Sequence, residues 1–342
     1  MSAEASRVPI SPGASPKTSL GNAGSLDPIF NPKTVAIIGA DEPTNGQQIL
    51  SAFLNSGFRG SSFIVHPRQS SVEGNLAYPS LAELPSKVDL AVAVTRPIAA
   101  PDILAECVEK NVRGVLLISS GFGEKGTSNA VAAGEMQAIL RGSRTRVIGP
   151  NSLGVINPSI GLNTTPGLQM PIGGTVAFLS ESAILGRVVL DWSLKHLVGL
   201  SAFASLGTML DVSWANLINY FGSDPSTRTI VLQVSSIGDA RSFISAAREV
   251  SLDKPVIVIK AGRGEASVRA VGWKSHNVPS DDDVLTAAFD RVGVLQVDTL
   301  EDLFMLPMPC RSRLGLRVGA SWWLATPMAP ESWRRTVWFA PG

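Results

Sequence analysis

The sequence contains few cysteines and few histidines. Its 342 residues include two cysteines and three histidines. So few cysteines exclude a disulfide scaffold and a Cys-based zinc finger. The histidines, His66, His196 and His276, lie far apart in the sequence, which argues against a His-rich metal site. We therefore expect no metal bound by this chain.

Net charge and long apolar runs are also lacking. The formal net charge is +1, which provides no chain-wide field to hold nucleic acid or an anionic membrane. No apolar run approaches the roughly 18 residues of a membrane span, and the start of the sequence lacks the apolar core of a secretory signal. We expect a cytoplasmic protein that binds neither nucleic acid nor a membrane.

A repeated alternation of strand and helix patterns is present instead. Short runs rich in Val and Ile, mostly without polar alternation, predict strands that are buried on both faces. Segments with helical spacing lie between them, and this alternation predicts an α/β fold with right-handed crossovers. The predicted strands are 34–39, 62–65, 89–94, 114–119, 146–149, 175–180, 229–234, 255–260 and 293–297. The predicted helices are 46–56, 98–110, 130–141, 183–196, 211–221, 239–251, 283–292 and 299–305.

Changes in composition divide the chain into four segments. The first residues are rich in Ser, Ala, Pro and Gly and cannot bury enough surface to offset the entropy of ordering, so we expect disorder there. The stretch 150–174 has four Pro, five Gly and no helical period, so we place a domain boundary near residue 160. Two doubly wound domains then lie between a disordered start and an atypical tail. The segments are 1–25, 26–160, 161–305 and 306–342.

A glycine after the first predicted strand indicates a phosphate-binding turn. This strand ends in Gly39, and the following helix opens near Gly46. Such a turn brings backbone N–H groups and a helix N-terminus to the carboxyl edge of a parallel sheet, where phosphates bind. The G-x-G-x-x-G motif is absent, so a plain strand–helix turn stays an alternative.

The end of the second strand helps to distinguish between cofactors. An NAD site has an acidic residue there, which bonds the ribose hydroxyls. This strand is followed by His66, a proline and Arg68. A basic end favours an extra ribose phosphate, as in NADP or coenzyme A. The alternative is that Arg68 is a solvated surface residue.

A series of motifs, in a fixed order over about residues 26–305, resembles one known family. The motifs include NPKTVAIIGA, VHPR, SLAELPSKVDLAVAV, GVLLISSGFGE, RVIGPNSLGVINP, GLNTTP, GTVAFLSESAILG, SLGTMLDV, DPSTRTIVLQV, KPVIVIKAGR and AAFDRVGVLQVDTLEDLF. They resemble the alpha-subunit region of NDP-forming (ADP-forming) acyl-CoA synthetases, which are relatives of succinyl-CoA synthetase alpha. The same region occurs in the N-terminal half of bacterial protein lysine acetyltransferases. The resemblance implies a CoA-binding Rossmann-like domain followed by a flavodoxin-like, succinyl-CoA synthetase-like doubly wound domain.

The resemblance also implies which residues of the first domain bind coenzyme A. Two residues after the first strand would approach the pyrophosphate, and a basic residue after the second strand would meet the ADP phosphates. Residues after the next two strands would line the path of adenine and pantetheine, and an asparagine would lie near the thiol. In this order, these residues are Gly39 and Ala40; Arg68; Val94, Thr95, Ile118 and Ser119; and Asn151.

In the second domain the resemblance implies a phosphohistidine. The family's histidine takes the phosphoryl group of an acyl phosphate and passes it to ADP, with the phosphate held at helix N-termini. Ser180 and Ser182, in the motif SESAILG, would provide this phosphate cradle. The family usually has Gly where Ala183 stands, and this difference argues against close backbone approach. The alternative is that both serines are N-capping residues.

The histidine itself departs from the family pattern. The family loop reads approximately S-H-T-G-x-L-x-G, whereas this chain has GWKSHNVPSDDDV. His276 follows a serine as in the family, but an alignment without gaps puts Lys274 in the place of the histidine. An earlier strand of the family reads approximately Y-I-E-S-I and carries a Glu that orients the histidine; Ser235 replaces this Glu here. His276 is therefore either the phosphorylated residue or an ordinary loop residue.

Three other residues or segments have structural explanations. The acidic run 281–283 is interpreted as a helix N-terminal cap, with a metal site as the alternative. His196 ends a predicted helix, where it would serve as a capping or surface group. Cys107 lies on a helical period and is interpreted as a core residue.

The last segment, 306–342, does not continue the family pattern. It holds four of the seven tryptophans and five arginines against one acidic residue, and strand–helix alternation stops. Back-translated with GC-rich codons, a neighbouring reading frame gives ELVVGNADGPGVMAADRV, which resembles the family's next segment. We therefore expect a frameshift near residue 306 and a longer natural protein.

These observations give one leading function and two alternatives. The leading hypothesis is the CoA-binding or acyl-CoA-binding part of an NDP-forming acyl-CoA synthetase, an acid–thiol ligase that works through a phosphohistidine. ADP or ATP with Mg would bind only to an ATP-grasp domain or beta subunit that this chain lacks, and a homo-oligomer is possible. The first alternative is a non-catalytic acyl-CoA-sensing module of a protein lysine acetyltransferase. The second is a NADP-dependent oxidoreductase, against which the absent G-x-G-x-x-G argues.

Overall fold

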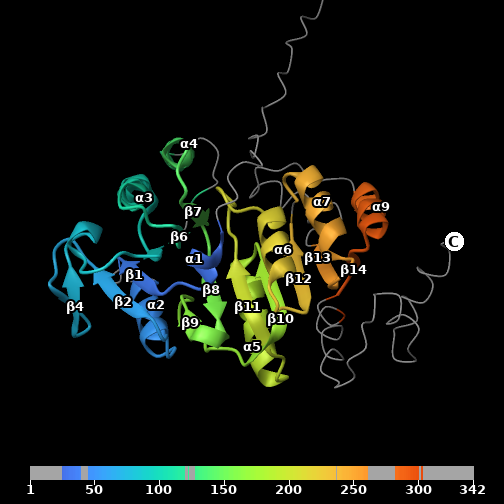
Figure 1. Cartoon of the computed structure of the whole chain (residues 1–342), viewed down its shortest axis with the longest axis horizontal. Helices are drawn as coiled ribbons and strands as arrows, with labels where there is room; N and C mark the ends of the chain where they lie inside the picture. The colour runs from blue at the N-terminus through green and yellow to red at the C-terminus, as the bar shows by residue number, and fades with distance from the viewer. Residues whose placement is uncertain are drawn as a thin grey trace, which may run out of the picture.

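The part of the chain that the structure describes contains two seven-stranded sheets with helices packed on them (Figure 1). The structure is a computed structural model. Strands before residue 149 build the first sheet, and strands after residue 153 build the second. This arrangement confirms the predicted α/β fold with two doubly wound units. The described residues are 25–39, 45–119, 122, 128–235, 237–260, 282–299 and 302.

The first sheet has a parallel core and an antiparallel strand, β3, at one edge. Its strand order is β3-β4-β2-β1-β5-β6-β7, so the chain starts in the middle and runs outward in both directions. This order brings the carboxyl ends of the central strands to one edge, where such sheets bind ligands. The strands are β1 (Thr34–Ile38), β2 (Ser61–Val65), β3 (Ser71–Val72), β4 (Asn75–Tyr78), β5 (Leu90–Ala93), β6 (Gly114–Leu117) and β7 (Arg146–Ile148), and the helices of this first unit are α2 (Gly46–Leu54), α3 (Ala100–Glu109) and α4 (Ser128–Leu140).

The second sheet also has a parallel core. Its order is β14-β13-β12-β10-β11-β8-β9, and β8 and β9 form an antiparallel edge. The strands are β8 (Gly154–Asn157), β9 (Leu162–Asn163), β10 (Gly173–Ser180), β11 (Leu200–Ser205), β12 (Thr229–Val234), β13 (Val256–Lys260) and β14 (Leu295–Val297), and the helices of this second unit are α5 (Ala183–Lys195), α6 (Trp214–Ser223), α7 (Ala240–Val250) and α9 (Asp282–Val292).

All nine predicted strands are present, with ends that differ by at most two residues. The prediction missed β11, because its sequence LSAFAS has small residues where a buried strand usually has Val or Ile. It also missed the short strands β3, β4, β8 and β9. The strand β8 precedes residue 160, where the sequence places the domain boundary, yet it pairs with β11 of the second sheet. Because many Gly and Pro residues surround β8, the sequence gives no sign that the chain joins the second sheet before residue 160.

The predicted helices are confirmed within the described residues, with one clear difference at a start. The helix predicted over 211–221 begins at Trp214, because Ser213 caps it. The Ser213 amide donates to the side-chain oxygen of Asn216 at 3.0 Å, as in a capping box. The predicted helix over 299–305, apart from residue 302, and the predicted disordered residues 1–24 lie outside the described residues.

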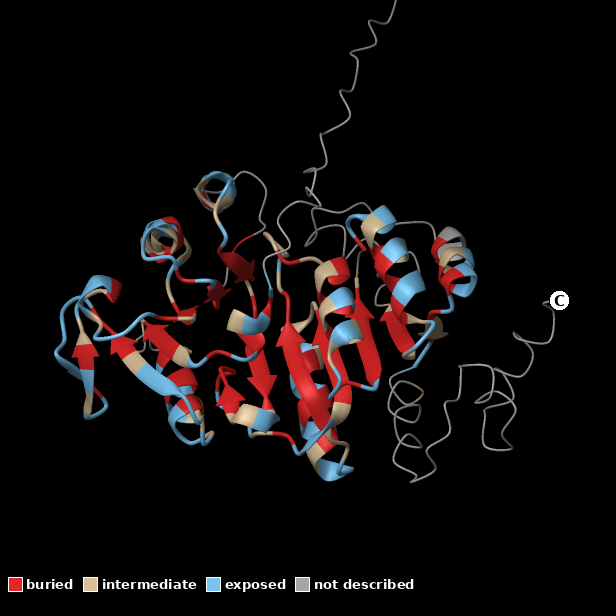
Figure 2. Cartoon of the chain, viewed as in Figure 1, coloured by how far each residue is buried: buried red, intermediate tan, exposed pale blue. Residues whose placement is uncertain are grey.

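Helices cover both faces of each sheet, and the central strands, such as β5, β6, β11 and β12, are buried along their whole length (Figure 2). In the first unit α3 and α4 pack on one face and α2 on the other. In the second unit α5 packs on one face, and α6, α7 and α9 on the other. One apolar cluster extends from α2 through both sheets to α9. The two units therefore share a core, which fixes their ligand-binding edges relative to each other.

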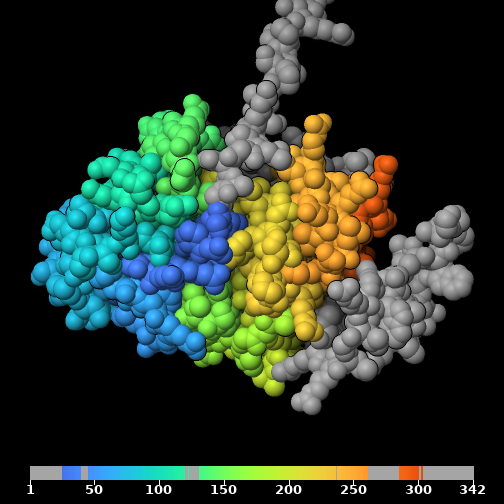
Figure 3. All heavy atoms as spheres, in the orientation of Figure 1, coloured from blue at the N-terminus to red at the C-terminus, as the bar shows by residue number. Residues whose placement is uncertain are grey.

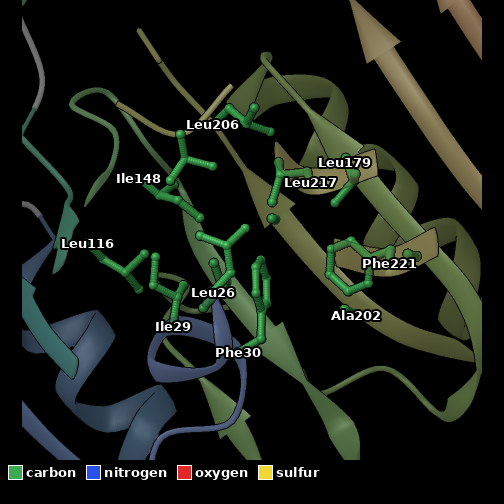
Figure 4. Packing of buried hydrophobic residues seen from close by; sticks show 14 of the residues in the cluster. Leu26, Ile29, Phe30, Leu116, Ile148, Leu179, Ala202, Leu206, Leu217 and Phe221 are labelled. Carbon is green, nitrogen blue, oxygen red and sulfur yellow. The ribbon is translucent and has the colours of Figure 1, made fainter. Parts of the chain in front are cut away.

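A short helix, α1 (Asp27–Phe30), lies between the two units (Figure 3). Its apolar side chains point to residues of both units, among them Leu116 of the first and Phe221 of the second (Figure 4). The Phe30 ring is 1% exposed and lies 4.9 Å from the Phe221 ring and 5.2 Å from the Tyr220 ring, between centroids. The Tyr220 hydroxyl donates to the Asp27 carboxylate at 3.0 Å. Burial, together with the Asp27 carboxylate, raises the pKa of the Tyr220 hydroxyl above its usual value.

A buried ion pair also connects the units. The Arg146 side chain on β7 is 6% exposed, and its Nε lies 2.8 Å from Oδ2 of Asp211, just before α6. The same Asp211 oxygen accepts from the Val147 amide at 2.9 Å. Arg146 also donates to Asn216 on α6 at 3.1 Å. Because a buried charge needs its partners, this network holds the end of the first sheet against the start of α6.

Two sequence predictions on single residues are confirmed. Cys107 is fully buried on α3, and burial raises the pKa of its thiol to about 12, so the thiol is inert at neutral pH. His196 stands at the C-cap of α5, where its ring stacks on Trp192 at 4.6 Å.

No helix among the described residues is both long enough and apolar enough to span a bilayer. In the same residues, no three His, Cys, Asp or Glu side chains converge in a way that could hold a metal ion.

Candidate functional site

Gly39 occupies a turn that only glycine fits. It directly follows β1 with a φ of +78°, in the left-handed region that favours glycine. A Cβ atom at this position would lie 2.0 Å from the carbonyl oxygen of Val94. The chain therefore passes so close to the end of β5 that no side chain fits between them, and the turn presents backbone rather than side chain.

The predicted CoA-binding residues after β5 and β6 continue the same edge. The Val94 amide donates to the last carbonyl of β1 at 2.9 Å, and the Ile118 amide donates to the last carbonyl of β5 at 2.9 Å. The Asn151 amide then donates to the carbonyl of Ser119 at 2.9 Å. Thr95 lies beside Val94 and is half-buried. The structure thus brings these residues together along one line at the carboxyl edge of the first sheet.

Ser119 has an unusual environment on this edge. Its side chain is 1% exposed, and its hydroxyl oxygen has no hydrogen-bond partner among the described residues. Buried hydroxyls are normally bonded, since leaving one unpaired costs about 1–3 kcal/mol. A polar group of a ligand on this edge would satisfy it.

Arg68 lies at the far side of the Gly39 turn, after β2, and is exposed. The loop that carries it is held by His66, which is 6% exposed. The His66 Nδ1 atom accepts from the amides of Arg68 at 3.2 Å and Gln69 at 2.8 Å. The histidine therefore shapes the loop that carries the exposed Arg68 at the carboxyl end of β2.

Asn151 connects the first edge with the second unit. It follows a cis Gly149–Pro150 bond and has a φ of +60°. Its Nδ2 donates to the Phe122 carbonyl at 2.8 Å and to the Thr208 hydroxyl at 2.8 Å. Thr208 belongs to the loop after β11. The ligand end that reaches Asn151 would thus lie where the two units meet.

The predicted phosphate cradle lies at the carboxyl edge of the second sheet. Ser180 ends β10 and is fully buried, and Ser182 is the N-cap of α5. The Ser182 hydroxyl accepts from the Leu185 amide at 3.3 Å, as an N-cap does. The Ser180 hydroxyl donates to Oε1 of Gln233 on β12 at 2.7 Å. Both serines therefore have structural roles, and they set the start of a 13-residue helix whose N-terminus favours anions.

Replacing Ser182 with alanine is expected to destabilise the chain by about 1 kcal/mol, because the N-cap bond to the Leu185 amide is lost. Urea unfolding followed by circular dichroism measures this change. Ser70→Ala, at an exposed loop position, is the control and should change the free energy of unfolding little. Equal stability of Ser182→Ala and wild type would show that the cap contributes nothing.

Sequence reasoning missed Glu181, which lies between the two serines. Its Oε2 accepts from the backbone amide of Ser235 at 2.9 Å, and its Oε1 accepts from Nε1 of Trp214 at 3.0 Å. Trp214 is the first residue of α6. A carboxylate thus lies beside Ser235, at the ends of β10 and β12. The signal available in the sequence was an acidic residue at the junction of a buried strand and a helix.

A surface groove of about 580 Å³ lies elsewhere, along α2 and the loop after β9. None of the predicted site residues lines it. The case for a site therefore rests on the strand ends and not on this groove.

Comparisons with known proteins match both units. The family model described as "CoA binding domain" matches residues 33–158, and the one described as "Succinyl-CoA ligase like flavodoxin domain" matches residues 173–308. The alpha subunit of acetate–CoA ligase (ADP-forming) I from Pyrococcus furiosus is 36% identical over 286 residues, which cover 82% of this chain and 62% of that protein. The chain belongs to the ADP-forming acyl-CoA synthetase family. The family resemblance stated from the motifs is confirmed.

Two further relatives extend this result. The 4-hydroxybutyrate–CoA ligase (ADP-forming) of Nitrosopumilus maritimus is 30% identical over 81% of this chain and 40% of that protein. Among solved structures, the dinucleotide-forming acetyl-coenzyme A synthetase 1 of Candidatus Korarchaeum cryptofilum, in complex with phosphate and ADP, superposes with a TM-score of 0.78. It shares 32% sequence identity over 83% of this chain and 62% of that chain. The chain thus spans less than two thirds of the length of these relatives.

The comparisons distinguish between the three functional hypotheses drawn from the sequence. The matched relatives are ligases and synthetases, so the main interpretation is supported, and neither the oxidoreductase nor the acetyltransferase alternative is favoured. Relative to the family pattern, Ser235 stands where a carboxylate is expected, and the structure supplies the carboxylate of Glu181 at 2.9 Å from its amide nitrogen. Ala40, Lys274, His276 and the segment 306–342 lie outside the described residues.

Proposed function

We propose that this chain is the CoA-binding, alpha-subunit-like part of an ADP-forming acyl-CoA synthetase that converts acyl-CoA, ADP and phosphate into carboxylate, ATP and CoA. The observation that carries the proposal is the continuous edge from Gly39 through Val94 and Ser119 to Asn151, in the unit that matches the CoA-binding family model. The rest of the machinery belongs to a partner or to a longer chain.

Coenzyme A would lie along this edge with its phosphates at one end and its thiol at the other. The Gly39 turn and the Arg68 guanidinium would hold the pyrophosphate and ribose phosphate, since backbone amides and a cation both favour anions. Pantetheine would run past Val94 and Ser119. The thiol would reach Asn151, which contacts Thr208 of the second unit. This direction suits the chemistry, because the acyl group must meet phosphate at the second unit.

The phosphoryl group would pass through the second unit in three balanced steps. Phosphate attacks the thioester carbon and displaces the CoA thiolate, which leaves an acyl phosphate. An imidazole nitrogen, which we assign to His276, attacks the phosphorus and releases the carboxylate. A terminal phosphate oxygen of ADP then takes the phosphoryl group from the imidazole and forms ATP. The α5 N-terminus, with Ser180 and Ser182, would stabilise the charge of the transferred group. Glu181 would supply the carboxylate that supports a charged imidazole.

The ADP step needs an ATP-grasp domain with Mg, supplied by a beta subunit or by further sequence. This requirement agrees with the alpha-subunit description of the Pyrococcus furiosus relative. We expect a complex in which the N-terminus of α5 faces that partner, because the phosphoryl group must pass from the second unit to the ADP bound by the partner.

Calorimetric titration of coenzyme A, acetyl-CoA and NADPH into the full chain tests the first part of the proposal. Micromolar binding of coenzyme A or acetyl-CoA, about −8 kcal/mol, with no binding of NADPH, is the expected result. Binding of NADPH alone would support an oxidoreductase, and a folded chain that binds none of the three would contradict the proposal.

Transfer of radiolabel from ATP tests the phosphohistidine. With a nucleotide-binding partner of the family and labelled ATP, we expect an acid-labile phosphate on the chain that disappears in His276→Asn and persists in Lys274→Ala. Persistent label in His276→Asn would move the role to another residue. A chain that binds CoA but takes no label from a competent partner would instead be an acyl-CoA-sensing module.

A further inference from the structure

Three polar side chains share one rung of the second sheet beneath the start of α5. Ser180 on β10 is in register with Ser205 on β11 and with Gln233 on β12. Residues in register on neighbouring parallel strands point to the same face. All three are almost completely buried, with exposed fractions of 0%, 0% and 1% for Ser180, Ser205 and Gln233. The preceding positions on this face, Phe178 and Phe203 among them, are apolar core. The apolar face thus ends in a buried polar row at the carboxyl edge.

The carboxamide oxygen of Gln233 accepts hydrogen bonds from its neighbours. Its Oε1 accepts from the Ser180 hydroxyl at 2.7 Å and from the Ser182 amide at 3.1 Å. The Ser182 amide, which also donates to the Ser180 hydroxyl oxygen at 3.0 Å, can only donate, so the carboxamide atom that faces it is the oxygen. The single proton of the Ser180 hydroxyl lies within reach of this oxygen and of the Ser182 carbonyl at 3.0 Å. The amide group therefore lies directly at the N-cap of α5.

The carboxamide nitrogen of Gln233 has no partner among the described residues. The Nε2 atom of Gln233 is buried and makes no hydrogen bond to any described residue. The hydroxyl oxygen of Ser205, on the other side of Ser180, is also buried and unbonded. Buried donors are normally satisfied, because an unmade bond costs folding free energy. A glutamine near the end of the mainly apolar strand sequence TIVLQV is therefore difficult to explain by folding alone.

The charge environment indicates what the ligand must be. Ser182 caps the Leu185 amide, and the amides of residues 183 and 184 precede the first intrahelical bond of α5. These amides and the positive end of the helix dipole favour an anion. An unpaired Nε2–H donor beside them needs an acceptor. A phosphoryl group provides acceptor oxygens and negative charge together.

We propose that Gln233 is a phosphoryl-binding residue of this site, whose Nε2 donates to an oxygen of the group that rests at the N-terminus of α5. This inference depends on the proposed function, since it assumes that a phosphoryl group visits this edge, and it adds a residue outside the Ser180–Ser182 cradle. Gln233 has two roles. Its oxygen fixes the cradle serines, and its nitrogen binds the ligand.

The variant Gln233→Glu separates these two roles. Glutamate keeps an oxygen in place of Oε1 for the bonds from Ser180 and Ser182, but it replaces the Nε2 donor with a second oxygen that repels phosphate. Binding of inorganic phosphate to the full chain is followed by line broadening in phosphorus NMR at pH 8. We expect at least tenfold weaker phosphate binding than in wild type. Gln296→Glu, with the same change on the edge strand β14, is the matched control and should bind phosphate as wild type does.

Coenzyme A affinity, measured on the same samples, distinguishes the possible failures. Unchanged CoA binding in Gln233→Glu shows that the variant is folded and that the loss is local. Gln233→Glu that binds phosphate as well as wild type overturns the role of Gln233, as does a wild-type chain that binds CoA but not phosphate. A wild-type chain that binds neither ligand contradicts the proposed function itself. If Gln233→Glu does not fold, Gln233→Met, which removes both the Nε2 donor and the Oε1 acceptor without adding a charge, is expected to lose at least the same tenfold in phosphate binding, and unchanged binding in it overturns the proposal.

Discussion

Replacing Gly39 with alanine is expected to weaken coenzyme A binding by about 10- to 100-fold. The new Cβ would lie 2.0 Å from the Val94 carbonyl oxygen, so the turn after β1 must move away from β5. A shift of this kind misplaces the backbone amides that we propose to hold the pyrophosphate. Loss of one charge-assisted hydrogen bond costs about 1.5–3 kcal/mol, which corresponds to this range of affinity. Calorimetric titration of coenzyme A measures it.

Gly74→Ala provides a matched control for this experiment. Gly74 has the same φ of +78° as Gly39, but nothing lies within 4 Å of the position its Cβ would take. Both variants carry the strain of a left-handed alanine, about 1–2 kcal/mol, and only Gly39→Ala adds the steric clash. We expect Gly74→Ala to be less stable than wild type but to bind coenzyme A normally. If a folded Gly39→Ala binds as tightly as Gly74→Ala, the turn after β1 does not hold the ligand.

The parallel strands could be predicted from the sequence, because a strand that is buried on both faces gives a short run of mainly apolar residues. Runs such as 229–234 are mainly apolar, and every such run is a strand. The strand β11 could not be found this way, because its buried positions carry mostly Ala and Ser rather than Val or Ile. The helix α1 was also missed, because four residues are too few to show a helical period.

The candidate site was predictable only where it depends on strand ends. Gly39, Val94, Ser119 and Asn151 each follow a strand, and doubly wound order alone brings them to one edge. The contacts of Glu181 and Gln233 join residues 54 and 53 positions apart, and no local pattern reports them. Whether Ser180 bonds Gln233 depends on the register of β10 against β12, which the sequence does not state.

Replacing Phe30 with alanine is expected to destabilise the chain by about 3–5 kcal/mol, the range for removal of a buried phenylalanine. The ring is 1% exposed and packs on Tyr220 and Phe221 of α6. Little around it can collapse into the space, because the surrounding side chains belong to two different units (Figure 4). Urea unfolding measures the loss, with Leu76→Ala as the control, since Leu76 is 65% exposed. We expect the control to change the free energy of unfolding by less than about 1 kcal/mol.

The shape of the unfolding curve tests a further consequence of this packing. If the ring couples the two units, its removal lets them unfold separately, and the single wild-type transition should split or broaden in Phe30→Ala. Coenzyme A should then stabilise only the transition of the first unit, because a ligand stabilises only the folded state that binds it. A single, sharp transition that shifts as a whole with coenzyme A would show that the shared core holds the units together without Phe30. In that case Arg146 and Asp211, whose ion pair spans the same junction at 2.8 Å, would be the next residues to test.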